Sequence, residues 1–274
     1  MLISIIFLAW THRRTRNLIV IAGLLPLLAG AYIYAEPVVK GTSRAVRLVT
    51  APVSAAMTAQ KRVPIYSVRT EEKKLAISFD AAWGADHTSH LLDILDEYEI
   101  KTTFFLVTFW VERYPDEARE IVARGHEIGL HSSTHPDFTA LSQENMKQEL
   151  NENARVVEDI TGFRPRLFRP PFGAYNERVL SVVEDELGYT TIQWSIDSLD
   201  WKDVDADFII RRIMNNLHRG AIVLLHNHAK HTAAALPRLL AAFKADGWKT
   251  VPISELLHRG EYTIDHQGRQ VPAR

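Results

Sequence analysis

The alternation of short apolar runs with longer amphipathic segments, beginning at Lys73, is the feature that most constrains this chain. The apolar runs have the length of buried strands, and the segments between them carry apolar residues at helical spacing. The expected strands are residues 75–79, 102–106, 127–130, 167–169, 190–195, 221–225 and 248–252, and the expected helices are 90–98, 115–124, 142–160, 176–187, 206–217, 232–245 and 254–258. Seven consecutive βα units predict an α/β fold and favour a barrel over an open sheet, although periodicity and length do not decide between them.

The N-terminal region predicts export. Residues 17–35 carry no charge and are long enough to cross a bilayer as a helix. The basic stretch 12–16 precedes them, which by the positive-inside tendency keeps residues 1–16 in the cytoplasm and sends the rest outside. Residues 29–31 resemble a small-x-small cleavage site, so a removed signal peptide is the alternative. The apolar run continues past that site, which favours a transmembrane anchor in the cell membrane over secretion.

The remaining boundaries follow from composition. Residues 36–70 contain three prolines and no sustained apolar period, which predicts a stalk before the domain at 71–260 and a tail at 261–274. The net charge of −1 gives no electrostatic reason to expect a nucleic-acid partner. The absence of cysteine excludes disulfides, thiolate metal ligands and cysteine nucleophiles.

Ionisable residues follow most of the predicted strands. Each has an ordinary alternative role as a helix cap, a surface charge or a core histidine, but the carboxyl ends of parallel strands in a barrel share one rim. We therefore expect these groups to meet at a single mouth, where the two histidines of an H-x3-H spacing would bind a divalent metal, with zinc the first candidate. The groups concerned are Asp80, His131, His135, Arg169, Asp197, Asp200 and His226.

The ordered motifs that contain these residues resemble those of the polysaccharide deacetylases, the NodB-homology group or carbohydrate esterase family 4. The motifs are Ser78-Phe79-Asp80, His131-Ser-Ser-Thr-His135, Arg169-Pro-Pro-Phe-Gly173, Asp197-Ser-Leu-Asp200-Trp201 and Leu224-Leu-His226. The resemblance implies a distorted (β/α)7 barrel and metal-dependent removal of acetyl groups from glycans. Together with the predicted anchor, it points to cell-wall and sporulation-type members, which share the Asp-Ala-Ala-Trp-Gly form of the first motif.

The resemblance also assigns roles. A metal held by His131 and His135 would activate a water and polarise the acetyl carbonyl. Asp80 would act as general base on that water and also as a candidate metal ligand. Arg169 would pair with Asp80 and keep it ionised.

His226 would act as general acid and protonate the departing glucosamine nitrogen. Asp200, or less favourably Asp197, would hold its imidazole. The backbone N–H of Tyr175 would complete an oxyanion site. Leu224 and Trp201 would shape the acetyl pocket.

Ala81 departs from the family pattern, which has an aspartate there as third metal ligand. Three outcomes are open: Asp86 reaches back to ligate, Asp80 binds the metal while water fills the gap, or the metal binds too weakly for catalysis. Trp83, in the rim loop, is a candidate sugar platform. Two function classes therefore remain, a glycan N-deacetylase of the cell wall and a catalytically silent glycan-binding relative. A metallopeptidase lacks its H-E-x-x-H motif in this chain.

Overall fold

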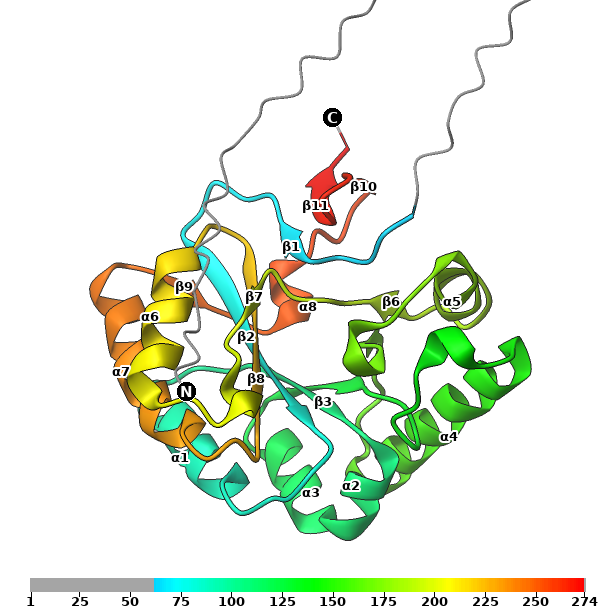
Figure 1. Cartoon of the computed structure of the whole chain (residues 1–274), viewed down its shortest axis with the longest axis horizontal. Helices are drawn as coiled ribbons and strands as arrows, with labels where there is room; N and C mark the ends of the chain where they lie inside the picture. The colour runs from blue at the N-terminus through cyan, green and yellow to red at the C-terminus, as the bar shows by residue number, and fades with distance from the viewer. Residues whose placement is uncertain (1–61, 274) are drawn as a thin grey trace, which may run out of the picture. The chain divides into compact units, whose positions relative to one another are not determined.

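The computed structural model describes residues 62–273, in which helices cover a curled sheet of mostly parallel strands (Figure 1). The strands are β1 Ser67–Val68, β2 Lys74–Ala81, β3 Thr103–Leu106, β4 Glu127–Leu130, β5 Leu167–Phe168, β6 Thr190–Thr191, β7 Ile196–Asp197, β8 Ala221–His226, β9 Lys249–Thr250, β10 Tyr262–Ile264 and β11 Arg269–Pro272. The helices are α1 Thr88–Glu97, α2 Thr108–Arg113, α3 Pro115–Ala123, α4 Gln143–Thr161, α5 Glu177–Leu180, α6 Ala206–Asn216, α7 Thr232–Ala245 and α8 Ile253–Leu256.

The parallel sheet has the order β8-β2-β3-β4-β5-β6, with β7 pairing β8 and β9 pairing β2. The α/β class expected from the sequence is confirmed. Of the seven regular βα units expected from the sequence, only some are present in regular form. The expected strand at 190–195 is split into β6, which pairs with β5, and β7, which pairs with β8; between them Ile192 pairs with Ile65.

The curled sheet is bridged by a segment that the sequence pattern predicted as stalk. Ile65 pairs with Ile192 beside β6, and Ser67 of β1 pairs with Ala221 of β8, so one stretch contacts both edges. The predicted tail likewise forms β10 and β11, and β11 pairs with β1. The expected boundaries at residues 70 and 261 were therefore wrong. These short strands lack a long apolar run, and only the neighbouring strands make them part of the sheet.

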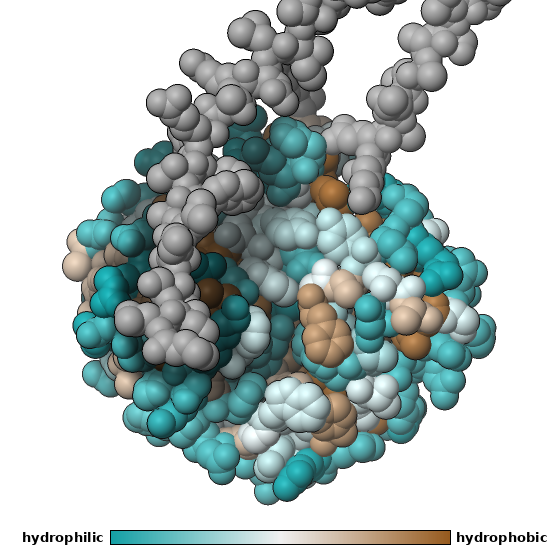
Figure 2. Space-filling model, in the orientation of Figure 1, coloured by the Kyte–Doolittle hydropathy of each residue, from teal (hydrophilic) through white to brown (hydrophobic). Residues whose placement is uncertain are grey.

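The N-terminal expectations for residues 1–16 and 17–35 lie outside the described residues. Between residues 62 and 273, no helix is both long and apolar enough to cross a membrane. The face seen in Figure 2 is mostly hydrophilic, with separate hydrophobic spots. Burial of apolar residues between the sheet and the helices leaves mostly polar side chains on this surface.

Strand β2 shows how the two faces of the sheet are used. Ile77, Phe79 and Ala81 belong to the larger apolar cluster, which includes residues of the covering helices. Ser78 and Asp80 alternate with them and point to the concave side, because successive side chains of a strand face opposite ways. The strand therefore buries one face in the core and delivers polar groups to the interior of the curl.

Gly129 of β4 leaves the space that Phe105 of β3 occupies. A Cβ at position 129 would lie 2.4 Å from the Phe105 ring, far inside van der Waals contact. The Phe105 ring in turn lies 4.0 Å from the guanidinium of Arg169, on the concave side of the sheet. Because Gly129 has no side chain, the Phe105 ring can occupy the position in which it packs against the Arg169 guanidinium.

We predict that Gly129→Ala lowers the free energy of unfolding by about 1–3 kcal/mol, because Phe105 must leave its position in a close-packed interior. Urea unfolding followed by circular dichroism measures this. Gly260→Ala is the matched control, since its Cβ would meet nothing within 4 Å and its stability should stay unchanged. Equal stability of both variants would contradict this account of β4.

Candidate active site

A cavity of about 480 Å³ opens at the carboxyl ends of the parallel strands. The ends of β2 and β8 and the loops after β4, β5 and β7 contribute its walls. The lining residues are Asp80, Trp83, His131, His135, Phe172, Gly173, Trp194, Asp197, Trp201, Leu224 and His226. Residues up to 146 positions apart in sequence thus share one mouth, because parallel strands end on the same side of a sheet.

Asp80 and Arg169 form a buried ion pair at the base of this cavity. Arg169 Nη1 donates to Asp80 Oδ1 at 2.6 Å, and Nη2 donates to Ser78 Oγ at 2.9 Å and to the Gln193 carbonyl at 3.2 Å. Burial acts to raise the pKa of Asp80, but the Arg169 charge and the nearby imidazoles outweigh it and lower that pKa. Asp80 is therefore ionised at neutral pH, and its second oxygen stays available to the cavity.

His131 and His135 lie beside Asp80. The ring of His131 is oriented by the Arg169 carbonyl, 2.7 Å from Nδ1; a carbonyl can only accept, so Nδ1 carries the proton and Nε2 faces Asp80 Oδ2 at 3.6 Å. The centroids of the two imidazoles are 5.0 Å apart. Burial lowers the pKa of His131, and burial and the His131 charge lower the pKa of His135 to about 4. Both rings are neutral near pH 7, as metal ligation requires.

Two further contacts fix the H-x3-H loop. The side chain of Asn153, on α4, accepts from the His131 backbone N–H at 3.0 Å. His135 has a left-handed backbone with φ 59°, and its N–H donates to Ser132 Oγ at 3.0 Å. The sequence did not single out Asn153; its place in the middle of an amphipathic helix gave no signal of this role.

His226 and Asp200 form a second charged pair across the mouth. Asp200 Oδ1 lies 2.7 Å from His226 Nδ1, while Oδ2 accepts from the His226 backbone N–H at 2.8 Å and from Thr232 Oγ1 at 2.7 Å. Burial acts to lower the pKa of His226, but the hydrogen bond and charge of Asp200 outweigh it and raise that pKa. The geometry favours a protonated His226 whose Nε2 is free for the cavity. Asp197 lines the cavity, but its Oδ1 accepts from the Leu199 backbone N–H instead.

The donor set for a metal is incomplete. His131, His135 and Asp80 offer two imidazole nitrogens and one carboxylate oxygen, a combination that suits zinc. The separation of 3.6 Å between His131 Nε2 and Asp80 Oδ2 is close to that of two donors on one tetrahedral ion, about 3.4 Å for bonds of about 2.1 Å. Nevertheless, the described residues contain no cluster of three or more His, Cys, Asp or Glu side chains arranged to hold a metal ion.

The expected alternative ligand does not reach the cavity. Asp86 is exposed in the loop before α1 and is not part of the cavity lining. Ala81 is fully buried in the apolar cluster and presents only a methyl group. The family pattern has a second carboxylate, at the position of Ala81. This chain therefore offers two histidines but only one carboxylate, that of Asp80. Of the three outcomes left open at Ala81, ligation by Asp86 does not fit this geometry.

The rim of the cavity is aromatic. Trp83, Phe172 and Trp201 are 56%, 72% and 53% exposed, although such large rings are usually covered. The rings of Phe172 and Trp83 lie 4.7 and 6.0 Å from that of His135, centroid to centroid. These side chains expose apolar ring surface at the entrance. Phe172 was not chosen from the sequence, although it lies inside the Arg169–Gly173 motif.

The other two predicted residues of the site are Leu224 and Tyr175. Leu224 lines the cavity wall from β8. The side chain of Tyr175 lies outside the lining, with its hydroxyl 3.3 Å from that of Tyr66. Only a backbone role at the cavity therefore remains for Tyr175.

Comparisons with known proteins show what this chain is similar to in sequence and fold. The family model described as polysaccharide deacetylase matches residues 67–192. Peptidoglycan-N-acetylglucosamine deacetylase of Bacillus cereus is 34% identical over 197 residues, covering 70% of this chain and 92% of that protein. Peptidoglycan-N-acetylglucosamine deacetylase PgdA of Listeria monocytogenes is 34% identical over 195 residues, covering 71% of this chain but only 41% of the relative. The chain thus spans less than half the length of that curated relative.

Among solved structures, BA3943 of Bacillus anthracis is 34% identical with a TM-score of 0.68, covering 71% of this chain and 68% of that chain. It is described as a pseudoenzyme of carbohydrate esterase family 4. A mutant of the same protein, 35% identical with a TM-score of 0.68 and covering 71% of each chain, is described as having restored enzymatic activity. This chain is therefore similar both to named deacetylases and to a protein described as a pseudoenzyme.

The raised pKa of His226 predicts a pH-dependent stability. Protonated His226 is paired with Asp200 in the folded state, so this stabilisation is complete below the unfolded pKa of about 6.5 and is lost as pH rises through the raised folded pKa. His226→Gln should therefore cost more stability in acidic solution, below the unfolded pKa of about 6.5, than in alkaline solution above the raised folded pKa. Urea unfolding at stepped pH measures the difference. The exposed His266→Gln is the control, and a gap for His226→Gln that is independent of pH would contradict the pairing.

Proposed function

This chain belongs to the polysaccharide deacetylase family, and from that premise we propose that it hydrolyses the acetamide group of N-acetylglucosamine-type residues in cell-wall polysaccharide, such as peptidoglycan or chitin-like oligomers. The observation that carries the proposal is the presence of two charged pairs in one cavity, Asp80 with Arg169 and His226 with Asp200. One supplies an ionised carboxylate and the other a protonated imidazole. Amide hydrolysis needs a base and an acid in these two states.

The residues account for the proton transfers. Asp80, held ionised by Arg169, accepts a proton from the attacking water, whose oxygen bonds to the acetyl carbon. His226 gives its proton to the glucosamine nitrogen as the carbon–nitrogen bond breaks, which releases acetate and a free amine. Asp200 stabilises the cationic imidazole and keeps its Nε2 turned toward the cavity.

A divalent cation, with zinc the first candidate, would be held by His131, His135 and Asp80, and would polarise the acetyl carbonyl and the attacking water. Burial keeps both imidazoles neutral, and the Arg169 carbonyl fixes His131 with Nε2 toward Asp80, the orientation that a ligand needs. We infer a lower metal affinity than in members with an aspartate at the position of Ala81, because one negative ligand is missing.

The rest of the cavity suits a sugar carrying a small acyl group. Leu224 and Trp201 line the cavity wall and would contact the acetyl methyl group. The Tyr175 backbone N–H would stabilise the oxyanion. The exposed rings of Trp83 and Phe172 offer apolar faces to the pyranose rings of a glycan chain.

The substrate class implies where the domain acts. We propose that residues 17–35 anchor the chain in the cell membrane, with residues 1–16 inside and the catalytic domain outside, where cell-wall glycan is accessible. Cleavage after residue 31 and secretion is the alternative. Both place the domain on the same side of the membrane.

The proposed activity is tested by acetate release from N-acetylglucosamine oligomers and from peptidoglycan. Metal-stripped protein should be inactive and should regain activity with zinc or another divalent ion. Asp80→Asn and His226→Ala should each lose about 100-fold or more in rate, the usual contribution of a general base or acid. Arg155→Gln, on the outer face of α4, is the control and should keep full activity. No acetate from the parent chain with any divalent ion would refute the proposal.

The second candidate is a catalytically silent relative that retains glycan binding. Ala81 favours it, as does the similarity to a member described as a pseudoenzyme. The family pattern has an aspartate at this position as third metal ligand, so we predict that Ala81→Asp raises zinc affinity, measured by calorimetry, and increases acetate release, although the Ala81 methyl group packs in the apolar cluster. Ala82→Asp, one position along, is the matched control. Acetate release by Ala81→Asp alone would establish the silent candidate, and unchanged zinc affinity in Ala81→Asp would contradict the third-ligand argument.

A further inference from the structure

Glu149, on α4, makes three hydrogen bonds to the H-x3-H loop at residues 131–135, although it lies outside the cavity lining. Its Oε2 accepts from the backbone N–H groups of Ser133 and Thr134, at 2.8 Å each. Its Oε1 accepts from the Thr134 hydroxyl at 2.6 Å. An ionised carboxylate accepts at both oxygens and donates at neither, so this one side chain satisfies three neighbouring donors. The proposed proton transfers make no use of it.

Glu149 and Asn153 hold the loop from the same face of α4. The two residues are four positions apart, which places their side chains next to each other on a helix. Asn153 is fully buried, accepts from the His131 backbone N–H at 3.0 Å and donates to the Leu106 carbonyl at 3.1 Å. Three of the five backbone N–H groups of residues 131–135 therefore donate to side chains of one helix.

The loop needs this support because two of its residues have a left-handed backbone. Ser132 has φ 74° and His135 has φ 59°, a region that residues with a Cβ rarely adopt. Such conformations persist only where the surrounding structure holds them. The Ser132 hydroxyl accepts from the His135 N–H at 3.0 Å, so the loop closes on itself. Glu149 holds the two residues between these strained positions.

The two imidazoles of the loop are held in different ways. The His131 ring is held directly, by the Arg169 carbonyl 2.7 Å from its Nδ1. The His135 ring contacts the rings of Phe172 and Trp83, which are themselves exposed. The direction of the His135 imidazole therefore depends more on the loop backbone than that of His131 does.

We propose that Glu149 is a positioning residue for metal binding, which holds the segment between His131 and His135 so that both imidazoles reach one divalent ion. This role rests on the metal site of the proposed function and applies whether or not the chain is catalytically active. Since Ala81 replaces the third ligand, metal affinity depends on how well the two imidazoles and the Asp80 carboxylate are prearranged. Residues that orient metal ligands from outside typically contribute about 10–100-fold to metal affinity.

The test is calorimetric titration of the metal-free full chain with zinc chloride. Glu149→Ala should weaken zinc binding about tenfold or more, because the loop loses all three hydrogen bonds. Glu149→Gln should weaken it by a smaller factor, because an amide oxygen still accepts from the two N–H groups but without charge assistance. Glu152→Ala, also on α4 and paired with Arg155, is the matched control and should bind zinc as the parent chain does.

Ser142→Ala separates positioning of the loop from stability of the helix. The Ser142 hydroxyl caps α4 by accepting from the Asn145 N–H at 3.2 Å, so its loss should lower the free energy of unfolding without changing zinc affinity. Amide hydrogen exchange of the metal-free protein gives a second measurement. The N–H groups of Ser133 and Thr134 should exchange about tenfold faster in Glu149→Ala and stay protected in Ser142→Ala.

Equal zinc affinity of Glu149→Ala and the parent chain would overturn the role of Glu149 and leave the metal site itself intact. Unchanged exchange at Ser133 and Thr134 in Glu149→Ala would also overturn it, as would an equal loss of zinc affinity in Ser142→Ala. Absence of zinc binding by the parent chain would instead refute the metal site of the proposed function, and the role of Glu149 with it. If Glu149→Ala fails to fold, unchanged zinc affinity in Glu149→Gln overturns the proposal.

Discussion

The buried ion pair between Asp80 and Arg169 is the interaction on which this site depends. Both side chains are almost fully buried, so burying either charge without the other would cost a large free energy. Arg169 also donates to Ser78 and to the Gln193 carbonyl, and its own carbonyl orients His131. Arg169 thus keeps Asp80 ionised and fixes the orientation of the neighbouring His131 imidazole.

The same arrangement makes the effect of Ala81 understandable. In the family pattern, a second carboxylate stands here and adds both a metal ligand and a negative charge. This chain has kept the groups that carry protons and lost a group that binds metal. Asp80 is consequently shared between Arg169 on one oxygen and the histidine side of the cavity on the other.

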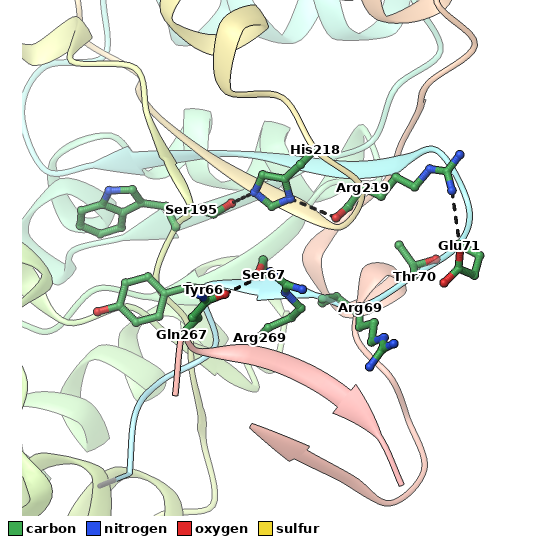
Figure 3. A pocket seen from close by; sticks show the side chains of 12 residues that line it. Tyr66, Ser67, Arg69, Thr70, Glu71, Ser195, His218, Arg219, Gln267 and Arg269 are labelled. Atoms are coloured by element: carbon green, nitrogen blue, oxygen red, sulfur yellow. Dashed lines mark hydrogen bonds and ion pairs between the residues drawn. The ribbon is translucent and has the colours of Figure 1, made fainter. Parts of the chain in front are cut away.

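The curl of the sheet depends on contacts between distant parts of the chain. Ile65 beside β6 and Ser67 beside β8 connect two edges that no regular βα unit joins. Gly129 leaves room for the Phe105 ring that lies against the Arg169 guanidinium, so close packing in the sheet fixes the position of this arginine. A second cavity, lined in part by Tyr66 and Arg269, forms at the same junction of β1 with β8 (Figure 3).

The sequence by itself determined the α/β class, most of the long elements and the family, because apolar periodicity and short ordered motifs are local properties. Asp80, His131 and His226 could be chosen for the same reason, since each directly follows an apolar run. Only the tertiary structure decided that residues 65–68 and 262–272 join the sheet, that Asp86 and the Tyr175 side chain lie away from the cavity, and that Asn153 and Thr232 support the site. Strands of two to four residues carry no periodic signal, and the direction of a loop side chain depends on neighbours that are remote in sequence.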